Sequence, residues 1–299
     1  MDISNLWLVF IIATNFFSAA VVLMDRHLVT SPTMIKPAVY AFYIGFLSIA
    51  AILILPFGLV SKPTPAIIGL ALITAVSYVL FILFFYKSLK LAHASDVAPA
   101  TGAVAAISTL VFSFLILGDK LPPNFIPGLI LLVGGTLFLS HLRFSRRVTL
   151  WVITGGFFFG LSSVLVKALF NTTPFWNAFF WSRIANVFGA FLLLAWPGNL
   201  KATAQSLKQS SIGTKTLVVF NKGLGGLAFL FFLAAVKLGD VSLTNALGGV
   251  QFAFLLVFAL AFGRKFPEYF SENVHHRHEI FHKIFATSAI VVGFFILFR

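Results

Sequence analysis

Two basic residues fall in the middle of long apolar stretches of the sequence. Lys222 stands in Phe220-Asn221-Lys222-Gly223, about ten residues into the stretch 212–236, and Arg183 stands about nine residues into the stretch 175–196. A charge at the centre of a bilayer costs about 2.5–3.5 kcal/mol on insertion scales, so such a residue normally faces a cavity or a partner. Lys222 and Arg183 are therefore candidates for binding an anionic group.

The acidic residues offer these two cations no obvious partner. All eight lie at or beyond the ends of the predicted spans: Asp2, Asp25, Asp96, Asp119, Asp240, Glu268, Glu272 and Glu279. Exchange of cations for protons typically needs a buried carboxylate, so their positions count against it. We predict that the counter-charge of Lys222 is a carboxylate or phosphate on a bound solute. The alternative is structural, with Lys222 bonded to carbonyl groups or snorkelling to one face, and Arg183 pinning neighbouring helices.

Uncharged polar and aromatic side chains occur at a similar depth in the predicted spans. Amides in membrane helices either bond to a neighbouring helix or line a wet cavity, and for each amide alone the helix–helix bond is the stronger interpretation. We nevertheless expect several of them to shape one pocket with the two cations. The predicted solute-binding set is Lys222, Arg183, Asn221, Asn245, Asn15, Asn186, Trp181, Gln251 and Tyr78.

A possible metal motif stands near the end of the chain. His278-Glu279-Ile280-Phe281-His282 fits the H-E-x-x-H pattern, in which two His on one helix face bind zinc and the Glu is a general base. The string lies at the start of the last predicted span, in a stretch rich in His, Arg and Glu. We interpret it as a polar interfacial loop, and predict no catalytic residue, no metal and no cofactor. Metal binding without catalysis, and a membrane zinc metalloprotease, are the alternatives.

Composition predicts a chain with many membrane spans. The sequence is 60% hydrophobic and 10% charged, whereas soluble domains average about 25% charged residues. Its net charge is +13, but most Lys and Arg stand in short breaks between apolar runs, which is typical of membrane loops and not of nucleic-acid binding. The sequence has no cysteine, which excludes disulfides and thiolate metal sites.

The apolar stretches predict ten membrane helices in two halves, because one span needs about 20 mostly apolar residues. The predicted spans are 3–24, 38–60, 66–86, 94–117, 125–142, 149–169, 175–196, 212–236, 241–262 and 282–298. A basic linker at 143–147 separates a first unit, residues 1–142, from a second, residues 143–299.

An internal repeat supports this division. Phe84-Phe85, Lys90-Leu91 and Ser95 recur 147 positions later as Phe231-Phe232, Lys237-Leu238 and Ser242. A fixed offset of about half the chain indicates two copies of one unit. Five spans per unit is an odd number, so the copies must insert in opposite orientations. We therefore predict an all-α integral membrane protein of about ten helices in two inverted five-helix repeats.

The fourth and fifth predicted spans resemble those of the drug/metabolite transporter superfamily, and in particular its EamA-like transporters. Ser95-Asp96-Val97-Ala98-Pro99 opens a helix of small residues, and Gly118-Asp119-Lys120-Leu121 resembles the family's turn, with Asp in place of the usual Glu. Gly128 and Gly134-Gly135 match glycines of the following helix. The second copy departs from the turn, since Gly263-Arg264-Lys265 has no acid.

The resemblance implies a multi-pass protein of the cell membrane that carries small metabolites by alternating access, often as an exporter. The family moves amino acids, drugs, sugars and other metabolites, so it implies no single solute. The expected partners are a small-molecule solute and membrane lipid, with no nucleic acid, and the chain would act as a monomer or homodimer. It would not be an enzyme. A non-transporting membrane scaffold is a further alternative. The placement of Lys and Arg puts both termini outside the cytoplasm, whereas the family implies the reverse, so both orientations stay open.

The metalloprotease alternative has a direct test. It requires zinc in the purified protein, measured by elemental analysis, and loss of proteolysis in Glu279→Gln. We expect no stoichiometric zinc, because the motif lies in a loop of mixed charges. Zinc at one ion per chain would contradict this expectation.

Overall fold

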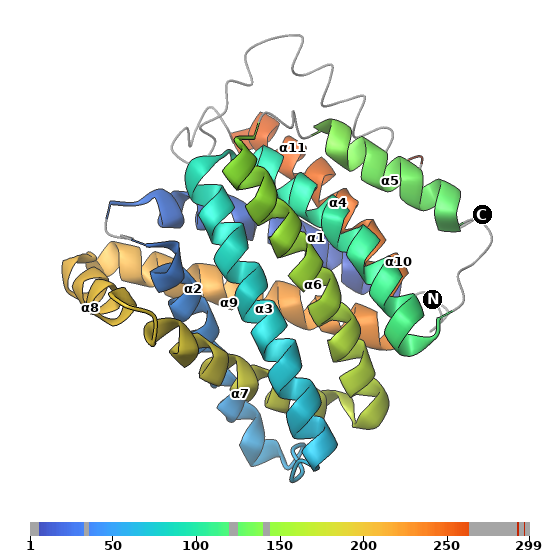
Figure 1. The fold of residues 1–299 in the computed structure, drawn as a ribbon, viewed down its shortest axis with the longest axis horizontal. Helices are drawn as coiled ribbons and strands as arrows, with labels where there is room; N and C mark the ends of the chain where they lie inside the picture. Colours follow the sequence, from blue (N-terminus) through green and yellow to red (C-terminus); the bar gives the residue numbers. More distant parts are fainter. Residues whose placement is uncertain are drawn as a thin grey trace.

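The protein is a bundle of helices joined by short connections (Figure 1). The computed structural model describes residues 6–32, 36–119, 125–139 and 144–262, together with residues 292 and 296. These residues contain no strand. The helices are α1 (Leu6–Thr30), α2 (Pro37–Phe46), the 3₁₀ helix η2 (Leu47–Phe57), α3 (Pro65–Leu91), α4 (Ala94–Phe112), the π-turn η3 (Ser113–Leu117), α5 (Phe125–Leu139), α6 (Arg146–Thr172), α7 (Phe175–Leu194), α8 (Asn199–Gln209), α9 (Ile212–Leu238), α10 (Val241–Ala246), the 3₁₀ turn η4 (Leu247–Gly249) and α11 (Val250–Phe262).

Seven of the described helices are long and apolar enough to cross a membrane. They cover residues 6–30, 37–57, 65–91, 96–117, 146–172, 175–194 and 212–238. Two shorter apolar helices, Ile126–Gly135 and Val241–Leu255, occupy the fifth and ninth predicted spans. The His278–His282 motif and all of the tenth predicted span except residues 292 and 296 lie outside the described residues. The all-α membrane class is confirmed, and the count of ten helices stays a prediction.

Large apolar side chains cover the outside of the bundle. Phe114, Leu192 and Phe220 are each at least 60% exposed, and all three lie within spans. Exposed apolar surface on this scale favours contact with a nonpolar environment over contact with water. These residues therefore form the surface that faces lipid.

The bounds of one pair of helices repeat with the same offset as the sequence. The helices α3 and α9 both have 27 residues, and α9 starts and ends 147 positions after α3. The side chains of Thr64 and Ser211, also 147 apart, each cap their helix by accepting a hydrogen bond from a backbone N–H three residues later. The repeat thus extends to local structure, while the inverted orientation of the halves and their boundary at residue 142 stay predictions.

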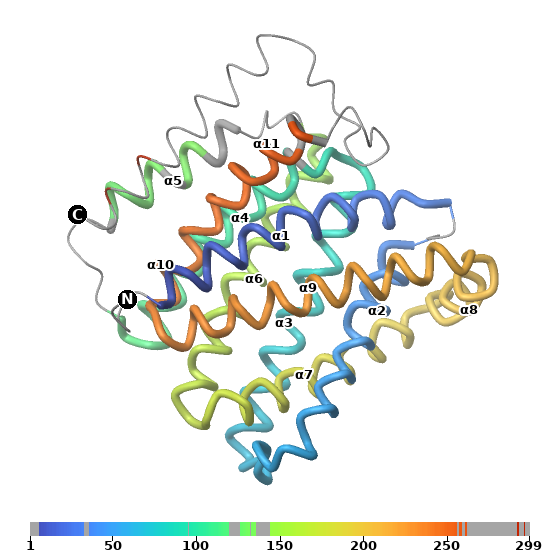
Figure 2. The backbone as a smooth tube through the Cα atoms, turned by 180° about the vertical axis from the view of Figure 1, so that it is seen from behind, coloured from blue at the N-terminus to red at the C-terminus, as the bar shows by residue number. Residues whose placement is uncertain are grey.

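The main packing contacts join helices from the two halves of the sequence. The helix α3 packs on α6, and α1 lies side by side with α9 (Figure 2). A third contact, between α4 and α6, depends on the absence of side chains on α6. A Cβ atom at Gly156 would lie 2.6 Å from Val104 Cβ, and one at Gly160 would lie 2.7 Å from Ser108 Cβ. These glycines let the two backbones approach closely, as small residues do between membrane helices.

Gly160→Ala tests this contact. The added methyl group would also lie 2.8 Å from the backbone nitrogen of Thr109, so the helices must separate. We expect a loss of about 1–3 kcal/mol of stability, as for other overpacked sites, seen as a lower melting temperature in detergent. Gly69→Ala is the matched control, because a Cβ there meets nothing within 4 Å. Equal melting temperatures for the two variants would contradict the packing described here.

Candidate functional site

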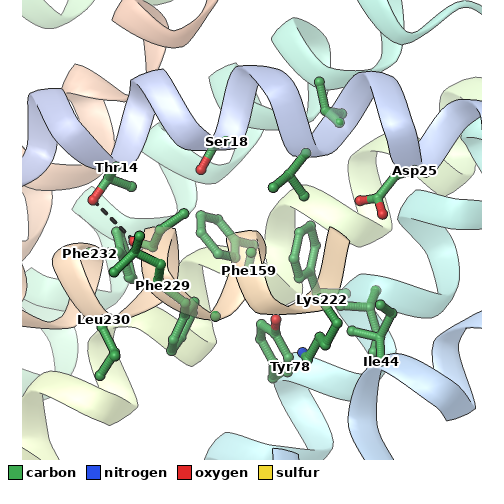
Figure 3. Close-up of a pocket in the computed structure, with 18 of the residues that line it drawn as sticks. Thr14, Ser18, Asp25, Ile44, Tyr78, Phe159, Lys222, Phe229, Leu230 and Phe232 are labelled. Carbon is green, nitrogen blue, oxygen red and sulfur yellow. Dashed lines mark hydrogen bonds between the residues drawn. The ribbon is translucent and has the colours of Figure 1, made fainter. Parts of the chain in front are cut away.

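A cavity of about 810 Å³ lies inside the bundle, between helices from both halves of the chain (Figure 3). Its volume falls within the range of small-molecule sites, about 300–1,000 Å³. Seven of the nine residues predicted to bind solute line it: Lys222, Arg183, Asn221, Asn245, Asn15, Gln251 and Tyr78. Asn186 and Trp181 are not among the lining residues. The structure therefore brings most of the predicted set around one space.

Lys222 projects into this cavity from α9. Its side chain is partly buried, and within the described residues it makes no hydrogen bond and no ion pair shorter than 4.0 Å. An ammonium group has three N–H donors, and these are free to meet a ligand. The structural alternative for Lys222, bonding to carbonyl groups, has no support among the described residues.

The expectation that every acidic residue lies at or beyond a span end is wrong for Asp25. The first span, predicted to end at residue 24, continues as α1 to Thr30, so Asp25 lies inside it. The side chain is 5% exposed and lines the same cavity as Lys222 (Figure 3). The helix can continue through a charged residue because the tertiary structure provides polar partners for the carboxylate, which the local sequence does not reveal.

Three neutral donors from three other helices hold the Asp25 carboxylate. Tyr40 on α2 donates to Oδ1 at 2.6 Å, and Asn221 on α9 donates to the same oxygen at 2.8 Å. Tyr86 on α3 donates to Oδ2 at 3.4 Å. The Asn221 amide also donates to the Tyr40 hydroxyl at 3.1 Å. Hydrogen bonds to a charged group are stronger than neutral ones, so this network joins four helices around the carboxylate.

Arg183 on α7 is held mainly by aromatic rings. Its guanidinium carbon lies 4.5 Å from the ring centroid of Phe229, 5.4 Å from that of Tyr78 and 5.9 Å from that of Phe179. Such cation–π contacts favour a desolvated cation. Asn186, one turn further along α7, accepts from both terminal nitrogens of Arg183 at 3.1 and 3.2 Å when its amide oxygen faces them. Asn186 thus positions Arg183 and does not line the cavity.

Two of the predicted amides use their N–H groups to join helices. Asn15 on α1 donates to the backbone oxygen of Leu247 at 3.0 Å, and Asn245 on α10 donates to the hydroxyl of Thr109 at 3.1 Å. Both still line the cavity. Trp181 lies elsewhere, because its indole donates to the backbone oxygen of Ser61 at 3.1 Å. For Asn15 and Asn245 the helix–helix interpretation describes the observed bonds.

Four buried polar atoms belonging to lining residues have no hydrogen-bond partner among the described residues. They are the Ser48 and Thr101 hydroxyl oxygens, Arg183 Nε and the Asn221 amide oxygen. Nearly all buried polar groups in proteins are paired with protein or water, so each such atom needs a partner. Their grouping around one cavity favours a site for polar atoms of a solute or of water. Sequence reasoning missed Ser48 and Thr101, because an isolated hydroxyl in an apolar helix gives no distinctive pattern.

Comparison with known proteins agrees with this architecture. Residues 5–141 match the family model of the EamA-like transporter family. A solved crystal structure aligns with 95% of this chain and 97% of its own, with a TM-score of 0.65 and 18% sequence identity, which shows a shared fold. A search of the curated proteins found no match. The resemblance to the EamA-like transporters is thus confirmed: the chain is a multi-pass membrane protein with an EamA-like unit at residues 5–141, and members of that family are transporters, not enzymes.

Tyr40→Phe tests the carboxylate network. The change removes the shortest hydrogen bond to Asp25 and leaves a buried charge with one donor fewer. We expect a loss of about 1.5–3 kcal/mol, as for other bonds to charged groups, measured as a lower melting temperature in detergent. Tyr43→Phe is the control, since that partly buried hydroxyl bonds to neutral groups, the backbone oxygen of Thr203 and the side chain of Ser206. If Tyr43→Phe lowered the melting temperature as much as Tyr40→Phe, the hydrogen bond to Asp25 would contribute no more to stability than an ordinary bond to a neutral group.

Proposed function

We propose that this protein exports a small metabolite across the cell membrane by alternating access, and that the solute carries a carboxylate or phosphate bound by Lys222. The observation that carries the proposal is the ammonium group of Lys222, which makes no hydrogen bond among the described residues and lies in a mostly apolar cavity. Lys222 is partly buried and interacts with the Asp25 carboxylate only through space, so an anionic solute would supply the bonded partner that it lacks among the described residues. An amino acid or an organic anion fits this description.

The other two charges in the cavity already have partners. Arg183 lies among aromatic rings and beside Asn186, and Asp25 accepts three hydrogen bonds. Lys222 is therefore the charge whose environment changes most when an anion binds. With two formal positive charges and one negative charge on these side chains, the cavity favours a solute with one anionic group over a solute with several.

Asp25 alters the argument against cation binding. Its carboxylate lines the cavity, so the position of the acids no longer counts against a cationic solute. Its three donors, however, already satisfy the carboxylate, whereas the Lys222 donors are free. This contrast supports an anionic or zwitterionic solute over a purely cationic one.

Transport requires that the cavity open first to one side of the membrane and then to the other. The helices around the cavity suit such a change. The bond between Asp25 on α1 and Asn221 on α9 joins the two halves of the sequence beside the cavity. Tilting of one half against the other would break this bond, and a solute on the neighbouring Lys222 would compete for the same region. In this proposal no metal or cofactor takes part.

Lys222→Met tests the proposal, because it removes the charge and keeps the length of the side chain. Purified protein is screened by thermal shift against anionic, zwitterionic and cationic metabolites. We expect anionic or zwitterionic compounds to stabilise the wild type and to bind about 10–100-fold more weakly to the variant, as for loss of a charge-assisted bond. Lys215→Met is the matched control: it removes an exposed lysine from the same helix.

Two outcomes would overturn the proposal. Stabilisation by cations alone would reverse the expected charge of the solute. Equal responses of Lys222→Met and the wild type would make Lys222 structural, as expected for a scaffold that transports nothing.

A further inference from the structure

The cavity meets the outside of the protein at a mouth in the side of the bundle. Five of its lining residues are also exposed, and they mark this mouth: Ala50 on η2, Trp176 at the start of α7, and Val219, Gly223 and Leu227 on α9. The three residues on α9 follow at intervals of four, so they form one stripe along the helix. The mouth therefore lies between η2, α7 and α9.

The position of this stripe along α9 places the α9 side of the mouth at mid-depth, whereas Trp176 marks its edge near the end of the α7 span. Gly223 and Leu227 lie two residues on either side of residue 225, the midpoint of Ile212–Leu238. At about 1.5 Å per residue, both are within about 3 Å of the centre of the helix. Ala50 lies three residues past the midpoint of the span 37–57. A helix that crosses a bilayer has its midpoint in the hydrocarbon, so this mouth opens toward lipid chains.

The walls of the mouth are mostly apolar, and open space lies beside α9. A Cβ atom at Gly223 or at Gly226 would meet nothing within 4 Å, so these glycines leave open space and do not pack against another helix. Leu47, Ala50 and Ile54 line the opposite wall on η2. A polar solute would find few hydrogen-bond partners here, whereas an alkyl chain would bury apolar surface.

The cavity behind the mouth has a charged end and an aromatic end. Figure 3 shows Asp25 and Lys222 toward one end of the pocket, and Leu230 and Phe232 toward the other. The volume of about 810 Å³ is far larger than a carboxylate or phosphate group needs. The site therefore has room for a head group at Lys222 and for a long apolar portion beside it.

We propose that the solute is an amphiphile, with an anionic head group at Lys222 and an apolar chain that extends through the mouth between η2 and α9. The inference rests on the proposed function, since it takes Lys222 as the ligand of the anion. It adds the chemical class of the solute and a second recognition element, the lateral mouth. Three independent features carry it: the free ammonium group, the depth of the mouth and its apolar walls.

The experiment measures binding of a series of straight-chain carboxylates, from four to twelve carbons, to the full-length protein in lipid nanodiscs. Binding to empty nanodiscs is subtracted. We expect the dissociation constant to fall by up to about fourfold for each added methylene group, as for full burial of apolar surface. Lys222→Met should weaken binding at every chain length.

Gly223→Trp places a large ring in the mouth. It should weaken binding of the ten-carbon acid by more than about tenfold, since several methylene groups lose their contacts, and leave the four-carbon acid unchanged. Phe220→Trp is the matched control, because residue 220 lies on the same helix, is 60% exposed and does not line the cavity. Leu227→Trp tests the same mouth if Gly223→Trp lowers the melting temperature.

The outcomes separate the two proposals. Binding that requires Lys222 but does not depend on chain length would overturn the amphiphile and leave an anion carrier. Failure of every acid to bind would overturn the amphiphile, and failure of the anionic and zwitterionic metabolites of the thermal-shift screen as well would overturn the proposed function itself. Equal effects of the Trp substitutions at positions 223, 227 and 220 would show that the mouth does not contact the chain.

Discussion

The rest of the structure depends on how one buried carboxylate is held inside a membrane helix. Asp25 lies on α1 with donors from α2, α3 and α9, so four helices must keep the register that delivers Tyr40, Tyr86 and Asn221 to it. A buried charge tolerates little departure from this geometry, since an unpaired one is costly. The same register places Lys222, the residue after Asn221, in the cavity. The hydrogen bonds to Asp25 thus fix the position of the part of α9 from which Lys222 projects into the cavity.

The basic residues within the spans include two kinds: those that bond to backbone oxygens at helix ends, and Lys222, the candidate for binding the solute. Lys167 on α6 donates to the backbone oxygens of Val236 and Gly239, both at 2.7 Å, at the end of α9. Arg26 on α1 donates to the backbone oxygen of Leu89 at 2.5 Å, at the end of α3, and Leu89 precedes Val236 by 147 positions. Both cations complement the negative end of a helix dipole. Lys222 has no such partner among the described residues, which distinguishes it from a helix-capping cation.

The two halves differ at the place where the cavity opens. In the first repeat Val79 on α3 faces α7, and a Cβ atom at Gly189 would lie 2.9 Å from it. Gly226, the residue of α9 that corresponds to Val79 by the offset of 147, faces open space. Thus α3 packs against a neighbouring helix at Val79, whereas the matching position of α9, Gly226, has no neighbour within 4 Å of its Cβ position. Such an asymmetry is what the proposed cycle would reverse, as the halves tilt and the separated helices come together.

The sequence by itself determined the membrane class, most of the spans, the repeat and the depth of Lys222 and Arg183, because long apolar runs and a fixed offset are local patterns. It did not determine which polar residues face the cavity. In the sequence Asp25 stands just after the apolar run 3–24, which places it at the end of a predicted span. Its hydrogen-bond donors are up to 196 positions away, and only the fold brings Asn221 to it. Trp181 and Asn186 have a similar depth to Arg183 but bond to Ser61 and to Arg183 itself. The direction a side chain faces follows from helix packing, and only the tertiary structure decides it.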